Sequence, residues 1–172
     1  MCSQILRLAS RLRTLVWLGI AMLIVMPSLA WFDPDLASRW PQSDFEWTWK
    51  NRLAAWALSA PPTLAVAIGL GQLLRFCGRV REQRAFTEAA ATALRRFGWA
   101  IIVGACILPA SRLGLWLYVG AVPTAAGTWT RFLFGQTLLA ASIGLTIGLA
   151  LLVFAALLRE ATRIAEENAS FV

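Results

Sequence analysis

The chain has 172 residues, of which 59% are hydrophobic and 15% charged, and its formal net charge is +7. Soluble domains contain about 45–50% apolar residues, so a soluble fold of this length could not cover so much apolar surface. The sequence has no histidine, and its three cysteines share no CxxC spacing, which argues against a metal site or a histidine-based catalyst. We therefore expect residues 1–172 to form one all-α transmembrane domain without a cofactor.

Four continuous apolar runs are long enough to cross a membrane, for which a helix needs about 20 residues. They cover residues 14–32, 53–74, 97–119 and 135–158. The runs lack the alternating pattern of membrane strands, so four transmembrane helices in two tandem hairpins are predicted. Pro61 and Pro62 lie inside the second run and should either kink that helix or mark the start of its regular part.

The first run has a second interpretation. Its basic start, its apolar stretch and the small residues Ser28-Leu29-Ala30 resemble a cleavable signal peptide. Cleavage after Ala30 would leave three spans. The apolar run continues through Trp31 and Phe32, which favours an uncleaved first helix, and the mass of the purified protein distinguishes the two alternatives.

The distribution of basic residues predicts the orientation of these spans. Eleven of the 16 lie in the N-terminal segment, in the loop at residues 75–96 and in the tail at residues 159–172, all on one side of the predicted membrane. Short cytoplasmic loops are enriched in Lys and Arg. We therefore expect a multi-pass membrane protein with both termini in the cytoplasm. The net charge then reflects topology, and direct nucleic-acid binding is not expected.

The predicted cytoplasmic face is strongly basic. Its candidate contacts to a partner or to anionic lipid headgroups are Arg75, Arg79, Arg81, Arg84, Arg95, Arg96, Arg159 and Arg163. Each basic residue near such a surface contributes roughly 1 kcal/mol of attraction to anionic lipid. Thr87 and Glu88 are expected to start a helix within the 75–96 loop, since threonine can cap a helix and glutamate favours its positive end.

An internal repeat supports the two hairpins. The segment after the second span, LLRFCGRVREQRAF, is similar to the segment after the fourth, LLREATRIAEENASF, so that Arg75 and Arg79 align with Arg159 and Arg163. In each copy the two arginines are four residues apart and share one helix face. Glu82 and Glu166 follow at a distance that permits local ion pairs. The helices that leave the membrane are therefore predicted to continue as short charged extensions.

Arg112 interrupts the third span. A charge within a membrane span is a functional-site hypothesis by default, because it is costly there. The other interpretation places Arg112 about one turn below the outer interface, from where its long side chain reaches the surface.

Small residues recur every four positions in the predicted spans. Those expected to allow close helix packing are Ala100, Gly104, Ala140, Gly144 and Gly148, with the pairs Ala65/Gly69 and Ala67/Gly71 in the second span. We interpret these stripes as contacts within a four-helix bundle, and the alternative is the interface of a homo-oligomer.

Two segments resemble a known bacterial family. The run Arg84-Ala85-Phe86-Thr87-Glu88, followed by Leu94-Arg95-Arg96-Phe97-Gly98, is similar to the family called domain of unknown function 2975, and so is the chain's ending. An asparagine of that family's pattern is replaced by Ala90 here, and a glycine of the pattern is missing at residues 161–162. The resemblance implies a four-helix inner-membrane protein without established activity. Its genes often adjoin a small helix-turn-helix regulator, which suggests such a regulator as a cytoplasmic partner.

The sequence favours a function other than catalysis. No paired carboxylates and no nucleophile motif lie at membrane depth, so we do not expect an enzyme. The first hypothesis is a membrane adaptor or sensor that holds a partner on its basic face. The alternative is an oligomeric small-solute transporter or channel component, suggested by the repeated hairpins.

Overall fold

The computed structural model describes residues 2–33, 48–81, 87–118 and 128–169, and within the helices it leaves out the side chains of residues 2–9, 27, 30, 79–81, 116, 128–134, 166 and 169. The described chain forms four helices: α1 (Cys2–Phe32), α3 (Trp49–Arg81), α4 (Glu88–Tyr118) and α5 (Thr128–Ala169). The predicted all-α fold is confirmed. Each predicted span lies within one helix, apart from Val119, which is outside the described residues.

Three of these helices, α3, α4 and α5, are long and apolar enough to cross a membrane, whereas the continuously described stretch of α1, residues 10–26, is shorter. The described core is built mostly from alanine, and Leu115 is its only large side chain that is fully buried. Large apolar side chains such as Ile68, Leu139 and Phe154 are instead more than half exposed. Exposure of such an apolar surface is unfavourable in water but favourable in the hydrocarbon of a membrane. The protein is therefore a multi-pass membrane protein.

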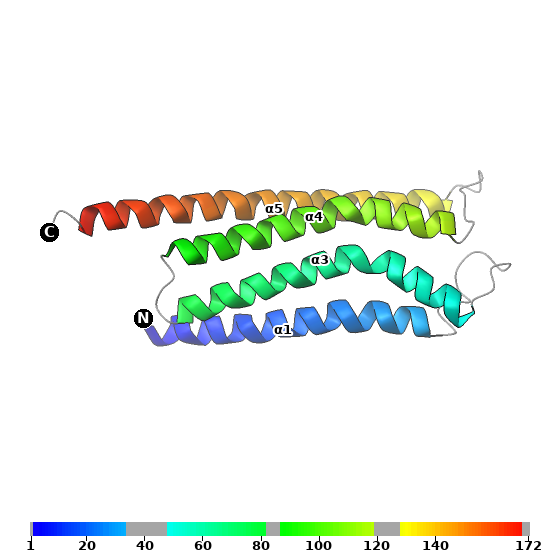
Figure 1. Cartoon of the computed structure of the whole chain (residues 1–172), viewed down its shortest axis with the longest axis horizontal. Helices are drawn as coiled ribbons and strands as arrows, with labels where there is room; N and C mark the ends of the chain where they lie inside the picture. Colours follow the sequence, from blue (N-terminus) through cyan, green and yellow to red (C-terminus); the bar gives the residue numbers. More distant parts are fainter. Residues whose placement is uncertain (1, 34–47, 82–86, 119–127, 170–172) are drawn as a thin grey trace.

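The helices pack in a row that follows the order of the chain. α1 packs on α3, α3 on α4, and α4 on α5, and all four run along the long axis of the molecule (Figure 1). Among the described residues, helices that are not consecutive have no Cα atoms within 8 Å of each other. A closed four-helix bundle is therefore not confirmed. The start of α1 and the end of α5 lie at the same end of the row as the end of α3 and the start of α4.

Helix α3 is continuous through its two prolines. It begins at Trp49, twelve residues before Pro61, so regular helix does not start at the proline pair, and Figure 1 shows α3 bending along its course. Proline at position 62 has no N–H to donate to the carbonyl of Leu58, four residues earlier. The hydroxyl of Ser111 on α4 donates a hydrogen bond to that carbonyl. The neighbouring helix thus supplies the donor that Pro62 lacks, as membrane helices require.

Small residues bring α3 and α5 close to opposite sides of α4. A Cβ added at Gly69 of α3 would lie 2.8 Å from the Cβ of Ala100, and one at Gly104 would lie 3.3 Å from the carbonyl oxygen of Pro62. On the other side, a Cβ at Gly148 of α5 would lie 3.0 Å from the carbonyl oxygen of Gly98. The backbones therefore approach as closely as small residues allow.

Helix α1 is attached to α3 through two indole–hydroxyl pairs. Trp31 Nε1 donates to Ser59 Oγ at 3.0 Å, and Trp56 Nε1 donates to Ser28 Oγ at 3.3 Å. The two bonds run in opposite directions between the helices. Trp31 is buried against Ala55 and Leu115, with Trp56 beside them. This cluster fixes the end of α1 on α3.

Candidate functional site

The arginines of the predicted cytoplasmic face converge at one end of the row, which we call the basic end. Five of them have described side chains there: Arg75 of α3, Arg95 and Arg96 of α4, and Arg159 and Arg163 of α5. Arg79 and Arg81 lie on α3, but their side chains are outside the described part, and Arg84 lies outside the described residues altogether. The predicted grouping thus involves three helices.

A helix cap positions the α4 arginines. The hydroxyl of Thr87 accepts a hydrogen bond from the backbone N–H of Ala90 at 3.3 Å, and α4 begins at Glu88. The start predicted from Thr87 and Glu88 is therefore confirmed. Because α4 begins here, Arg95 and Arg96 lie two turns into the helix and on adjacent sides of it.

A cleft of about 820 Å³ lies between α4 and α5 at the basic end. Its floor is made of small and apolar residues, including Ala91, Ala155 and Leu152, and Trp99 stands at its side with half of its surface exposed. Arg95 lines the α4 side of the cleft. The cleft therefore combines an apolar floor with a charged rim, which is formed by Arg95, Arg159 and Arg163 together with Glu88 and Glu160.

A second hollow of about 460 Å³ lies between α3 and α4. Arg75 and Arg96 line it from opposite helices, and Glu88 and Thr92 line both this hollow and the α4–α5 cleft. The two spaces are thus separated by one face of α4. Consecutive arginines, Arg95 and Arg96, face one space each.

The α5 arginines are neutralised locally. Arg159 lies 3.5 Å from Glu88 across the α4–α5 cleft, and Arg163 pairs with Glu160 at 2.6 Å and with Glu167 at 3.5 Å. Glu82 lies outside the described residues, and so does the side chain of Glu166, so the ion pairs expected of them are not tested. All the described partners are more than half exposed, and exposed pairs contribute ~0–1 kcal/mol each. These pairs orient side chains more than they stabilise the fold.

Arg95 and Arg96 differ from these neighbours. Both are exposed, and neither makes an ion pair or hydrogen bond with any residue that the structure describes. Among the described residues, Arg75 donates to the amide oxygen of Gln72, at 3.4 Å. Arg95 and Arg96 are consequently available to an anionic partner.

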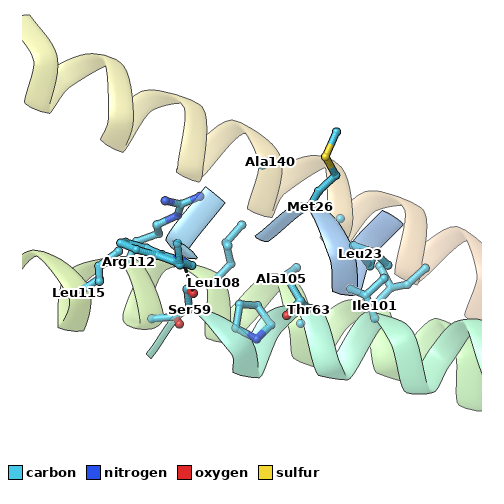
Figure 2. A pocket seen from close by; sticks show the side chains of 16 residues that line it. Leu23, Met26, Ser59, Thr63, Ile101, Ala105, Leu108, Arg112, Leu115 and Ala140 are labelled. Atoms are coloured by element: carbon cyan, nitrogen blue, oxygen red, sulfur yellow. Dashed lines mark hydrogen bonds between the residues drawn. The ribbon is translucent and has the colours of Figure 1, made fainter. Parts of the chain in front are cut away.

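Arg112 lies elsewhere, at one end of an elongated groove of about 530 Å³ that we call the Arg112 groove (Figure 2). All four helices line it, for example Met26 of α1, Thr63 of α3, Leu108 of α4 and Ala140 of α5. The row of helices therefore curls around this space. Helix α4 continues six residues past Arg112 to Tyr118, so Arg112 lies within the helix and does not end it.

The structure separates the predicted small-residue stripes into two groups. Gly69, Ala100, Gly104, Gly144 and Gly148 lie at the α4 interfaces. Ala140 is exposed and lines the Arg112 groove, and a Cβ at Gly71 would have no neighbour within 4 Å. Sequence periodicity alone could not separate these groups, since both have the same spacing.

Sequence reasoning missed several residues of both sites. At the basic end these are Trp99 and Thr92, which line the clefts. The available signal was a tryptophan three residues after the consecutive arginines. The Ser111 hydrogen bond to α3 was also missed, because it depends on which helix faces the Pro62 carbonyl.

The family described as "Protein of unknown function (DUF2975)" matches residues 14–172. The chain belongs to this family. The match includes the whole of the described α3, α4 and α5 and most of α1, so the basic end and the Arg112 groove both lie within the DUF2975 region. No curated protein and no solved structure matches the chain. The family is of unknown function, so the match by itself indicates no activity.

Proposed function

We propose that this DUF2975 protein is a non-catalytic adaptor or sensor of the bacterial inner membrane. In this proposal all four helices cross the membrane as two hairpins, and the basic end and both termini face the cytoplasm. The excess of arginine at the basic end supports this orientation. The α1 helix stays attached in the mature protein, which its hydrogen bonds to α3 at Ser28 and Trp31 support.

The observation that carries the proposal is the availability of Arg95 and Arg96. Each lines a different cleft, both are exposed, and neither is paired with a described residue. The larger cleft adds an apolar floor and Trp99. An amphipathic helix with acidic residues beside its apolar face fits such a surface, since helix-in-groove recognition uses apolar anchors and charges give orientation. The proposed partner is a cytoplasmic protein that presents such a helix.

Site-specific photo-crosslinking in native membranes tests this function. A photoreactive residue at Thr92, which lines both clefts, should crosslink to a cytoplasmic protein, and the matched position Leu138 on the apolar surface of α5 should not. Combining Arg95→Glu with Arg96→Glu should abolish the crosslink, whereas Lys50→Glu at the other end should leave it unchanged. Crosslinks at Thr92 that join only copies of this chain would contradict the adaptor proposal.

A second candidate is a small-solute transporter or channel component that works as an oligomer. What supports it is the Arg112 groove, because all four helices line it and Arg112 could contact an anion. Anion flux into proteoliposomes should then fall when Arg112 is replaced by alanine. Flux that is equal for Arg112→Ala and the unaltered protein would remove this role.

A further inference from the structure

We propose that the Arg112 groove binds one anionic phospholipid, with an acyl chain along the groove and the headgroup phosphate on the Arg112 guanidinium. This inference concerns the end of the molecule opposite the basic end and does not rest on the adaptor function. Its basis is the polarity of the groove, its length and the position of its single free cation among the described lining residues.

The groove runs in the direction that a lipid chain takes in a bilayer. Its lining on α4 extends from Leu115 to Ile101, which is roughly 21 Å of helix at ~1.5 Å per residue. Half of a hydrocarbon core ~30 Å thick is about 15 Å, so the groove covers the depth of one leaflet. Figure 2 shows Arg112 and Leu115 at one end and Leu23 and Ile101 toward the other.

The hydroxyl groups of the lining are already satisfied by the protein. Ser59 donates to the carbonyl of Trp56 at 2.9 Å, Thr63 donates to that of Ala60 at 2.6 Å, and Ser111 donates to α3. Trp31 donates to Ser59. The rest of the lining is Leu, Val, Ile, Met, Pro, Ala and Gly. Below Arg112 the groove thus offers an apolar surface to its occupant.

Arg112 is the exception. It makes no hydrogen bond or ion pair with any residue in the described part of the chain. It lies six residues before the end of α4 at Tyr118, about 9 Å of helix at ~1.5 Å per residue, and an arginine at that depth extends toward the headgroup layer. A planar guanidinium binds phosphate with two parallel hydrogen bonds. A phosphate at the membrane surface would therefore meet Arg112 while its acyl chain continued toward Ile101.

The groove is also accessible from the bilayer. Helices α1 and α5 both line it without Cα atoms within 8 Å of each other in the described residues, and the lining residues Met26 and Ala140 are exposed. The lining between these two helices has small side chains that protrude little, namely those of Ala140, Gly144, Gly104 and Ala105. An acyl chain from the surrounding leaflet could enter sideways without separating packed helices. The volume of the groove, about 530 Å³, lies in the ~300–1,000 Å³ range of ligand sites.

Native mass spectrometry tests this directly. The protein is extracted from vesicles of equal parts phosphatidylglycerol and phosphatidylcholine, and the retained lipids are counted. We expect one retained phosphatidylglycerol and an approximately fivefold preference for it, which Arg112→Gln abolishes and Lys50→Gln does not. Equal retention by Arg112→Gln and the unaltered protein overturns the proposal.

Further variants and measurements identify the occupant of the groove and distinguish loss of binding from misfolding. Ala140→Leu, which narrows the groove, should reduce retention of both lipids, whereas Arg112→Lys should keep the preference. Added phosphatidylglycerol should raise the melting temperature of the unaltered protein in detergent, but not that of Arg112→Gln. Displacement of the lipid by millimolar glycerol 3-phosphate would instead assign the site to a free phosphate, and a lipid-free dimer broken by Ala140→Leu would assign the groove to a second copy; either result overturns the proposal.

Discussion

Around α4 the helices approach until side chain meets backbone, whereas α1 is joined to α3 by indole–hydroxyl hydrogen bonds. At the α4 interfaces the closest approaches involve Gly69, Gly104 and Gly148. On α1 the only described glycine near its partner is Gly19, where an added Cβ would lie 3.8 Å from Leu70, an ordinary contact. In lipid, burial of apolar surface does not drive helices together, so close packing and hydrogen bonds must do so. The α3–α4–α5 unit therefore combines close packing with hydrogen bonds from Ser111 and Tyr118 to α3, whereas α1 depends mainly on hydrogen bonds.

The largest expected effect is at the closest contact. Gly148→Leu should lower the free energy of unfolding by about 1–3 kcal/mol, because its Cβ would meet Ile102 at 2.5 Å and the Gly98 carbonyl. The matched control is Gly71→Leu, where a Cβ has no neighbour within 4 Å. Unfolding by denaturant in detergent micelles measures both. Equal losses for the two variants would show that α4 and α5 are not packed this closely.

An intermediate effect is expected at the hydrogen bond from Ser111 to the Leu58 carbonyl, which joins the closely packed helices α4 and α3. Ser111→Ala should cost about 1 kcal/mol, because that carbonyl then has no donor in hydrocarbon. With Pro62→Ala in place, an N–H four residues later can serve the same carbonyl, so most of this cost should disappear. A double-mutant cycle measures the coupling. Additive losses would mean that Ser111 does not replace the missing proline donor.

The smallest expected effect is at α1. Trp56→Phe should cost about 0.6 kcal/mol, the average for a hydrogen bond between membrane helices. Trp17→Phe is the control, since Trp17 is 55% exposed and makes no hydrogen bond among the described residues. Stability in detergent and the rate of proteolysis between α1 and α3 should both respond to Trp56→Phe. If Trp17→Phe costs as much, the indole–hydroxyl pairs do not hold α1.

Local features of this fold could be predicted from the sequence, because they depend on neighbours in the chain. The apolar runs indicated the helices, and Thr87 with Glu88 indicated the start of α4. The continuation of α3 and α5 beyond the predicted spans, to Arg81 and Ala169, also followed from the charged repeat. Figure 1 shows the end of α5 extending past the other helices.

Contacts between helices could not be predicted in the same way. Ala67 and Gly71 have the same spacing as Ala65 and Gly69, yet only Gly69 has a close contact, because the rotation of α3 against α4 decides which stripe is buried. The arginines of the basic end were identifiable as a group. That Arg159 is paired while Arg95 is free depends on where Glu88 lies across the cleft.

We propose that the basic end faces the cytoplasm and that the opposite end faces the periplasm. Labelling of single cysteines, introduced after Cys2, Cys77 and Cys106 are replaced by serine, tests it most directly. Ala89→Cys and Lys50→Cys are exposed at the two ends of the molecule. In intact cells a membrane-impermeant maleimide should label Lys50→Cys and should label Ala89→Cys only after the inner membrane is permeabilised. Labelling of Ala89→Cys in intact cells would show that the basic end faces the periplasm instead.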